Sequence, residues 1–321
     1  MSPKNKLISV FFCAVLLVAC RTDAAFSEET STTASRMSGT QAMILGIVEG
    51  LTEYLPVSST GHLLLTQRIM GIGSDKSLSK NEQQREKEAA DAYAICIQAG
   101  AIIAVLGLYF GRVRQMILGL FGRDPIGLRL LIGVAAGFLP AAVLALLFNK
   151  HIKEYLFGPW PVVAAWLVGG LAILFVSYKN RRNEKRPLGQ ALEELTWKMA
   201  LIIGFAQCIA MWPGVSRSLV TIVGGVFVGL SLPAAVEFSF LLGVVTLGAA
   251  TAYDGLKHGQ VMLQTFEPQS LAIGLFFAFV SAVVSVKWMV AYLNRHGLAI
   301  FGYYRVAIAL LTAVLLLTNT I

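Results

Sequence analysis

Residues 49–65 read EGLTEYLPVSSTGHLLL, a stretch that mixes two acids, a histidine and a Ser-Ser-Thr run with leucines around Pro56. The chain that contains it is 56% hydrophobic and only 14% charged, with a mean hydropathy of +0.69. Soluble domains carry about 25% charged residues, so the composition predicts an all-α protein that crosses a membrane several times. Charged side chains at membrane depth are costly and mark functional sites. Residues 49–65 are therefore the first candidate for such a site.

Long apolar runs alternate with short polar breaks from Gln41 onward. Residues 74–90 are hydrophilic, and we expect them to form a solvated loop. Runs near the ~20 residues that a bilayer requires predict about six transmembrane helices, at 92–110, 128–148, 161–178, 234–253, 270–290 and 299–320.

The first forty residues differ in composition from the remainder. Lys4 and Lys6 precede a short apolar run that ends in LVAC at Cys20, and a Ser/Thr-rich linker continues to residue 40. The run is short for a membrane span and is typical of a signal-peptide core. Cleavage, retention as an anchor and lipidation all stay open for residues 1–40. Residues 41–321 are expected to form one membrane-embedded domain.

The net charge of +8 comes from basic residues in the short loops between apolar runs. Arg112, Arg114 and Arg123 follow one span, and a second basic group at 179–186 follows another span later in the chain. This is the positive-inside pattern, so both groups are expected on the cytoplasmic face. The chain has no basic helix or aromatic-basic platform, and we expect no nucleic-acid partner.

A second segment of the chain resembles the opening one. LGIVEGLTEYLPVSST starts at Leu45 and IGFAQCIAMWPGVSRS at Ile203; each has a glycine, a polar residue three positions later, then proline, valine and hydroxyl groups. Paired, proline-interrupted segments indicate a duplicated fold with a site at the repeat interface. Broken helices leave free backbone groups that lipid cannot satisfy. We therefore predict an inverted repeat with two re-entrant helix pairs and halves at about 41–178 and 199–321. Two kinked spans are the alternative.

The acidic pair is the first element of a predicted site. Glu49 and Glu53 are four residues apart and so share one helical face. Two carboxylates in a low-dielectric setting repel, so one takes a proton or a cation lies between them. No soft ligand is nearby, so the expected cation is a hard divalent ion, Mg²⁺ or Ca²⁺, held by Glu49, Glu53 and substrate oxygens.

Donors suited to phosphate follow both prolines. Arg217 is the only arginine within 199–230, and its planar fork fits phosphate; its alternative role is an internal counter-ion. His62 lies near the serines and is suited to acid or base chemistry; its alternative is a structural histidine. The remaining predicted phosphate contacts are hydroxyl and glycine residues: Ser58, Ser59, Thr60, Gly61, Gly214, Ser216, Ser218 and Thr221. One of the serines is a candidate nucleophile.

EGLTEYLPVSSTGH and PGVSRS..T resemble the two signature motifs of the undecaprenyl-diphosphate phosphatase family, the bacitracin-resistance type of integral membrane enzyme. The similarity runs from about Gln41 to the C-terminus and includes EFSFLLGV from Glu237 and YYR ending at Arg305. The resemblance implies removal of the terminal phosphate from undecaprenyl (C55) diphosphate, which recycles a cell-wall carrier lipid and confers bacitracin tolerance. It also implies divalent-metal dependence and an inverted-repeat fold.

The resemblance also carries roles to matching positions. Ser59 falls on the proposed nucleophile and His62 on the proposed acid or base. The acidic motif covers Glu49 and Glu53, and the phosphate-binding motif covers Arg217, Ser216, Ser218 and Thr221. Leu219 stands where the family usually has glycine. This larger side chain makes Thr221 the least secure assignment.

The same resemblance implies a multi-pass protein of the bacterial cytoplasmic (inner) membrane. Its expected partners are undecaprenyl diphosphate and membrane lipid, and a homodimer is left open. We expect the site to open to the outer face, where a recycled carrier diphosphate is released. The alternative function is a transporter or flippase for prenyl phosphates, because secondary transporters are also built from inverted repeats with broken helices.

Overall fold

A computed structural model describes residues 37–72, 79–156, 158–181, 189–318 and 320 of the chain. Most of the predicted leader and linker, residues 1–36, lies outside the described residues. The described chain is helical, with one isolated bridge between Gln190 and Leu230. Its elements are α2 (Gly39–Thr52), α3 (Ser59–Ile69), α4 (Lys80–Leu108), α5 (Phe110–Leu120), α6 (Pro125–Leu156), α7 (Pro159–Arg181), η2 (Leu192–Glu194), α8 (Trp197–Cys208), η3 (Ile209–Met211), α9 (Arg217–Phe227), α10 (Leu232–Thr265), α11 (Pro268–His296) and α12 (Ala299–Leu317).

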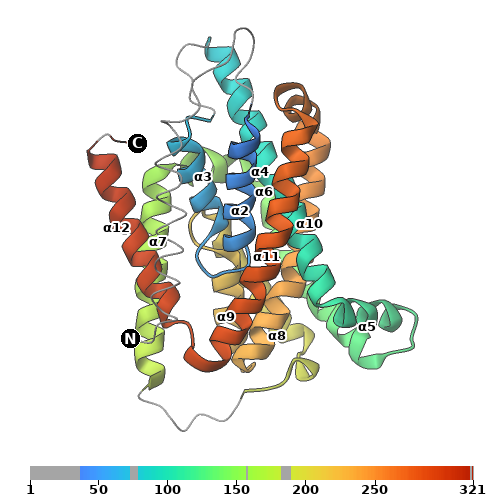
Figure 1. Cartoon of the computed structure of the whole chain (residues 1–321). Helices are drawn as coiled ribbons and strands as arrows, with labels where there is room; N and C mark the ends of the chain where they lie inside the picture. The colour runs from blue at the N-terminus through green and yellow to red at the C-terminus, as the bar shows by residue number, and fades with distance from the viewer. Residues whose placement is uncertain (1–36, 73–78, 157, 182–188, 319, 321) are drawn as a thin grey trace.

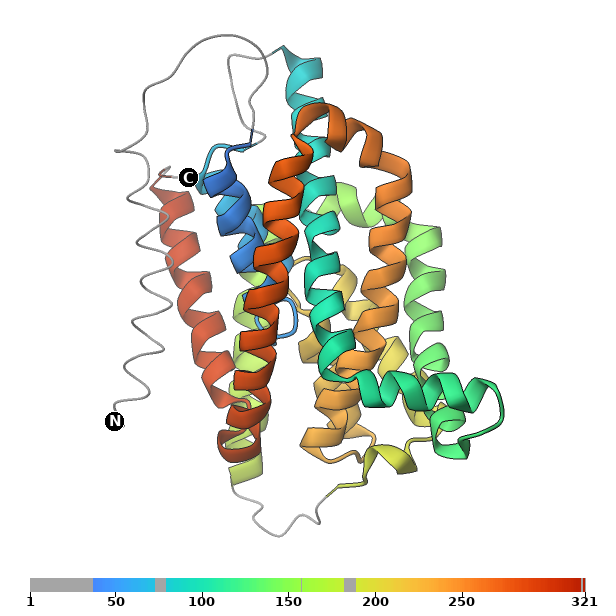
Figure 2. The ribbon, with the colours of Figure 1, turned by 45° about the vertical axis from the view of Figure 1, so that its right-hand side comes forward.

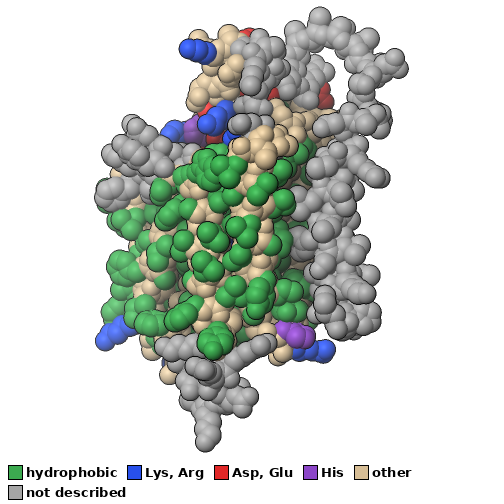
Figure 3. Space-filling view, turned by 90° about the vertical axis from the view of Figure 1, so that its left-hand side faces the viewer, with side chains coloured by type: hydrophobic (Ala, Val, Ile, Leu, Met, Phe, Trp, Pro, Cys, Tyr) green, Lys and Arg blue, Asp and Glu red, His purple; other side chains and the backbone are tan. Residues whose placement is uncertain are grey.

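Six helices of the described chain are long and apolar enough to cross a membrane: α4, α6, α7, α10, α11 and α12. The predicted number of spans is therefore confirmed. Large apolar side chains cover the outside, and Leu256 and Phe227 are 91% and 83% exposed. Figure 3 shows this hydrophobic surface over the middle of one face, with charged side chains toward its two ends. Such a surface suits a lipid solvent, in which apolar groups need no further burial.

The prediction of a loop over 74–90 is wrong from residue 80 onward, where α4 begins. Ser79 caps this helix: its hydroxyl accepts from the Glu82 N–H, and the Glu82 carboxylate accepts from the Ser79 N–H. This capping box satisfies two backbone donors and starts the helix well before its apolar part. The charged turns are also not uniformly solvated, because Glu86 is only 4% exposed.

Two pairs of short helices lie among the long ones. The helices α2 and α3 have 14 and 11 residues, and α8 and α9 have 12 and 11. At about 1.5 Å per residue none of them crosses a hydrocarbon core of about 30 Å. The α2–α3 pair lies toward one end of the bundle and the α8–α9 pair toward the other (Figures 1 and 2). These are the predicted re-entrant pairs, around Pro56 and Pro213.

The two pairs share one local geometry. Ser58 precedes α3 and Ser216 precedes α9, with φ of 73° and 75°; they are the only non-glycine residues of the described chain with positive φ. The packing also matches, because α2 lies along α11 and α8 lies along α6. Both contacts are glycine-mediated: a Cβ on Gly46 or Gly204 would overlap the backbone of the neighbouring helix. This correspondence fits the predicted inverted repeat.

Candidate active site

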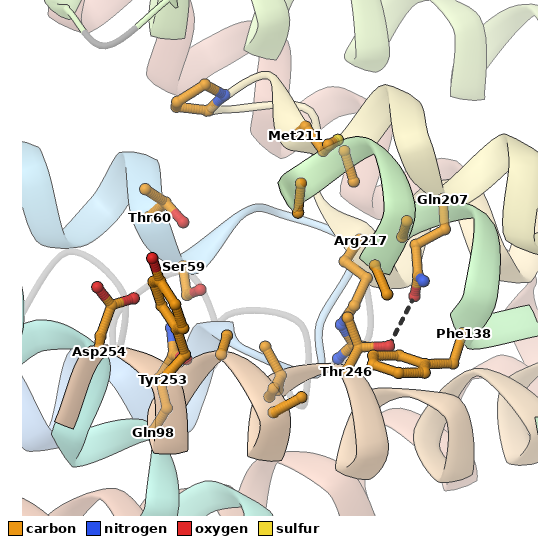
Figure 4. A pocket seen from close by; sticks show the side chains of 18 of the residues that line it. Ser59, Thr60, Gln98, Phe138, Gln207, Met211, Arg217, Thr246, Tyr253 and Asp254 are labelled. Atoms are coloured by element: carbon orange, nitrogen blue, oxygen red, sulfur yellow. Dashed lines mark hydrogen bonds between the residues drawn. The ribbon is translucent and has the colours of Figure 1, made fainter. Parts of the chain in front are cut away.

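A cavity of about 830 Å³ lies between the two helix pairs, within the usual size range of ligand sites. Residues on both sides of the two prolines form much of its polar wall, and α4, α6 and α10 complete it. Seven predicted site residues line it: Glu53, Ser58, Ser59, Thr60, Gly214, Ser216 and Arg217. Figure 4 shows Ser59 and Thr60 at one end and Arg217 with Gln207 at the other.

An acid from the first half meets the guanidinium from the second half at this cavity. The Ser59 hydroxyl donates a short hydrogen bond to Glu53 Oε2. Arg217 Nη2 donates to Glu53 Oε1 at 3.3 Å, and both of these side chains are at least nine-tenths buried. Ser59 and Arg217 are the first residues of α3 and α9. Two helix N-termini therefore meet at the cavity, and their free N–H groups favour an anion.

Arg217 is held on further sides. Its Nη1 donates to the Ser239 carbonyl at 2.9 Å, and its Cζ lies 5.5 Å from the centroid of the Tyr54 ring. The buried Nε has no hydrogen-bond partner among the described residues. The guanidinium is thus a counter-ion for Glu53 and also lines the cavity, so both of its predicted roles are geometrically compatible.

Glu49 lies behind the cavity wall. It is fully buried, does not line the cavity, and neither carboxylate oxygen has a hydrogen-bond partner among the described residues. Two unpartnered acceptors one helical turn from Glu53 fit a hard cation, which prefers oxygen ligands. No group of three or more His, Cys, Asp or Glu side chains gathers in the described chain. Other oxygens would have to complete the coordination of a metal here.

His62 faces away from the cavity. Its Nδ1 lies 2.6 Å from the Ser58 carbonyl oxygen and its Nε2 lies 2.7 Å from the Tyr304 hydroxyl. Because a carbonyl only accepts, Nδ1 carries the proton and Nε2 accepts from Tyr304. The ring stacks on Tyr304 and meets Trp166 edge-on. In this arrangement His62 holds the backbone before Ser59, and Glu53 is the carboxylate in contact with the Ser59 hydroxyl.

Three further predicted contacts also lie outside the cavity lining. The Ser218 hydroxyl donates to the Leu55 carbonyl at 2.8 Å and so joins the two loops. The Thr221 hydroxyl bonds to the Arg217 carbonyl at 2.8 Å and to Ser239 at 2.6 Å. Gly61 packs against Trp166, where a Cβ would overlap the indole. These residues support the site from behind.

The Leu219 side chain does not line the cavity and so does not narrow it. Its side chain is buried in the hydrophobic cluster that also contains Tyr54, Ile222 and Phe240. The orientation of Thr221 is set by its bond to Ser239 on α10. The hydrophobic core therefore accommodates the larger side chain that stands where the family usually has glycine.

Arg305 is a central residue to which the sequence analysis assigned no role. It is fully buried, and its Nη1 donates to the carbonyls of Pro56 and Val215 at 3.3 and 3.1 Å. Its Nη2 donates to those of Ala165 and Gly214 at 2.9 and 2.8 Å. One guanidinium thus satisfies free carbonyls of both broken segments. A charged residue inside the run 299–320 was the available signal.

Four polar residues of the long helices also lie at the cavity, and none of them was predicted as a site residue. Gln98 of α4 and Tyr253, Asp254 and Lys257 of α10 line the cavity. Figure 4 shows Tyr253, Asp254 and Gln98 on the side of Ser59. Gln98 lies within an apolar run and the other three follow one, and only the tertiary packing brings them together at the cavity.

Comparisons with known proteins identify the family of this chain. Residues 42–311 match the model of the family described as bacitracin resistance protein BacA. An undecaprenyl-diphosphatase of Sorangium cellulosum is 45% identical over 273 residues, which are 84% of this chain and 84% of the relative. Undecaprenyl-diphosphatase 2 of Rhodospirillum rubrum is 43% identical over 84% of this chain and 92% of the relative. An undecaprenyl-diphosphatase of Nitrosomonas europaea is 41% identical over 85% and 94%.

Proposed function

The chain belongs to the bacitracin resistance protein BacA family, and we infer from this that it hydrolyses undecaprenyl diphosphate to undecaprenyl phosphate and inorganic phosphate. The observation that carries this function is the Ser59–Glu53–Arg217 series at two helix N-termini in one cavity. A nucleophile, a base and a cation beside an anion-receptive pocket suit phosphoryl transfer. The product is a lipid carrier for cell-wall synthesis, and consuming its diphosphate confers tolerance to bacitracin.

The reaction uses the contacts of Ser59. Its Oγ attacks the terminal phosphorus while its proton passes to Glu53, and the phosphoanhydride P–O bond breaks with its electron pair leaving on the prenyl phosphate. Water then attacks the phosphoserine and releases inorganic phosphate. Arg217 and the N–H groups at the starts of α3 and α9 stabilise the charge on the transferring group. His62 and Tyr304 hold the Ser58 carbonyl and thereby position Ser59.

The apolar side of the cavity supports a lipid substrate. Small residues of α6 and α10 (Ala141, Ala142, Ala145, Ala249 and Ala250) line it together with Leu146 and Leu147. The two leucines are also exposed on the outside of the bundle. A cavity that reaches a lipid-facing surface can take the diphosphate inside while the prenyl chain remains among lipid tails. A soluble phosphate ester needs no such opening.

The charge distribution supports a cavity that opens to the outer face of the cytoplasmic membrane. Arg112, Arg114 and Arg123 belong to α5 and the turn after it, at the lower end of the bundle in Figure 1. The cavity residues Tyr253 and Lys257 lie in the last turns of α10, toward its turn into α11 at the upper end. Basic ends of membrane proteins stay in the cytoplasm, and this rule favours a cavity that opens on the opposite, outer face.

Replacing Ser59 with alanine is expected to lower kcat for phosphate release from C15 or C55 prenyl diphosphate on the order of 10³-fold, because the nucleophile is lost. The measurement is phosphate release by purified protein in detergent. Ser270→Ala is the matched control: this buried serine donates to the Met37 carbonyl, away from the cavity, and full activity is expected. Near-normal turnover by Ser59→Ala would favour direct attack by water. Binding without release by the unmodified protein would favour the transporter.

A divalent cation, Mg²⁺ or Ca²⁺, would be held by Glu49 and Glu53, and when bound it neutralises charge on the phosphates. EDTA is expected to abolish phosphate release, and added Mg²⁺ or Ca²⁺ to restore it. Glu49→Gln is expected to raise the metal concentration needed for half-maximal activity about tenfold or more, because it removes a ligand charge. Activity that resists EDTA in a metal-free buffer would contradict this assignment.

A further inference from the structure

Gln207 holds the position in the second half that Glu49 holds in the first. Each follows a repeat glycine by three residues, Gly204 and Gly46, on a short helix before the break. Their settings differ, because Glu49 lies behind the wall whereas Gln207 lines the cavity while only 3% exposed. The repeat thus places a carboxylate on one side of the site and a neutral amide on the other.

Of the two polar atoms of the Gln207 amide, Oε1 has a hydrogen-bond partner and Nε2 has none among the described residues. The Thr246 hydroxyl shares its one proton between the Leu242 carbonyl at 2.9 Å and Gln207 Oε1 at 3.3 Å. Gln207 Nε2 is buried and has no hydrogen-bond partner among the described residues. Buried donors are rarely left unpaired, because the lost hydrogen bond is not replaced by water. Because Gln207 lines the cavity, a small rotation of its side chain would turn this unpaired N–H toward a ligand acceptor there.

The neighbourhood of this donor identifies the chemistry of its ligand. Gln207 and Arg217 lie together at one end of the cavity, next to Thr246 and Phe138 (Figure 4). A guanidinium and an amide N–H side by side offer only donors, which fits an oxygen-rich anion. Gln207 is also neutral, so it adds a hydrogen bond without the repulsion that a second carboxylate would cause.

We propose that Gln207 binds a phosphate oxygen of the diphosphate through Nε2, and that Thr246 sets the orientation of the amide. The identity of the ligand as a prenyl diphosphate rests on the proposed function. The donor itself rests on the burial of Gln207, its free Nε2 and its place in the cavity lining. The second half of the repeat then contributes two anion ligands, Arg217 and Gln207, and the first half contributes the acids.

Steady-state hydrolysis of farnesyl diphosphate by the full chain in detergent tests the proposal. Gln207→Met is expected to raise KM about tenfold with kcat within about threefold of the parent, because one hydrogen bond to a charged group is lost. Gln207→Glu is expected to lose more, since a carboxylate has acceptors only. Thr246→Val is expected to raise KM by a smaller factor, and Thr246→Ser to recover most of it.

Gln67→Met is the matched control for loss of a buried glutamine. Gln67 is 6% exposed and its Nε2 donates to the Ala90 carbonyl at 3.1 Å, outside the cavity lining. This variant is expected to lower the thermal unfolding temperature without changing KM. An unchanged KM in Gln207→Met or in Gln207→Glu overturns the proposal. If Gln207→Met does not fold, Gln207→Glu and Thr246→Val decide it.

Binding of inorganic pyrophosphate separates this inference from the proposed function. The probe is expected to inhibit hydrolysis competitively and to raise the unfolding temperature, with both effects weakened about tenfold in Gln207→Met. Gln207-dependent pyrophosphate binding without hydrolysis of farnesyl diphosphate would contradict the proposed phosphatase activity and support the role of Gln207 as a ligand. Hydrolysis together with pyrophosphate binding that does not depend on Gln207 would support the phosphatase activity and contradict the role of Gln207 as a ligand.

Discussion

Arg217→Ala is expected to lower kcat/KM for prenyl diphosphate hydrolysis by about 10³-fold or more, in the range seen when an arginine that stabilises transferring phosphate is removed. The substitution deletes the cavity's buried guanidinium and leaves Glu53 without its ion-pair partner. A buried carboxylate without its ion-pair partner is costly. Arg217 also holds Glu53 beside the Ser59 hydroxyl, so this one change weakens both phosphate binding and the positioning of Glu53 against Ser59.

Arg217→Lys separates the two effects. A lysine keeps the positive charge near Glu53 but lacks the planar fork, which here reaches both the Ser239 carbonyl and Glu53. Partial recovery, by about tenfold over Arg217→Ala, is expected. The readout is kcat and KM for phosphate release, with folding checked by thermal unfolding in the same detergent. Wild-type kcat/KM in Arg217→Ala would remove Arg217 from the reaction.

Arg305→Met is expected to lower the free energy of unfolding by at least about 3 kcal/mol and to abolish activity. The substitution keeps an unbranched side chain but removes the donor from the carbonyls of Pro56, Gly214 and Val215 in the broken segments. It also removes a donor from the Ala165 carbonyl of α7. Each buried acceptor left unsatisfied costs about 1–3 kcal/mol. The measurement is thermal or denaturant unfolding in detergent, together with phosphate release.

Arg305 does not line the cavity, so its effect on activity is expected to come through the stability of the loops. A group that acts only through the loops changes stability and activity together, whereas a direct substrate ligand changes activity alone. Arg305→Lys is expected to fall between, because one ammonium cannot reach all four carbonyls. An unchanged unfolding temperature in Arg305→Met would show that the loops hold themselves without the guanidinium.

The two arginines have different expected roles: Arg217 contacts the reacting groups, and Arg305 stabilises the backbone around them. Arg217 contacts Glu53 at the cavity, and Arg305 holds the backbone on which Ser59 and Arg217 are mounted. The strained φ of Ser58 and Ser216 belongs to the same backbone. Such strain persists only where surrounding contacts over-determine it. His62, Trp166 and Arg305 supply those contacts from α3, α7 and α12.

Local signals were sufficient for the architecture. The six spans follow from hydropathy over ~20 residues, and the two re-entrant pairs follow from proline and hydroxyl groups within apolar runs. The juxtaposition of Glu53 with Arg217 followed from the repeat, because equivalent segments meet at its interface. The start of α4 was missed because a charged, apolar-poor stretch has a loop-like composition, although Ser79 and Glu82 carried a capping signal.

What the sequence determined by itself is which segments enter the membrane, where two of them break, and which residue types stand at the breaks, since each depends on neighbours along the chain. Which way those residues face was decided by the tertiary structure alone. A short helix buried in protein has partners on every side, so the sequence spacing of its polar residues does not show which of them line the cavity and which pack against neighbouring helices. Tyr304 turns His62 away from the cavity, and Ser239 turns Thr221 away, while Thr246 contacts one end of the Gln207 amide and leaves the other without a partner among the described residues. These partners come from α10 and α12, far along the chain, and only packing brings them into place.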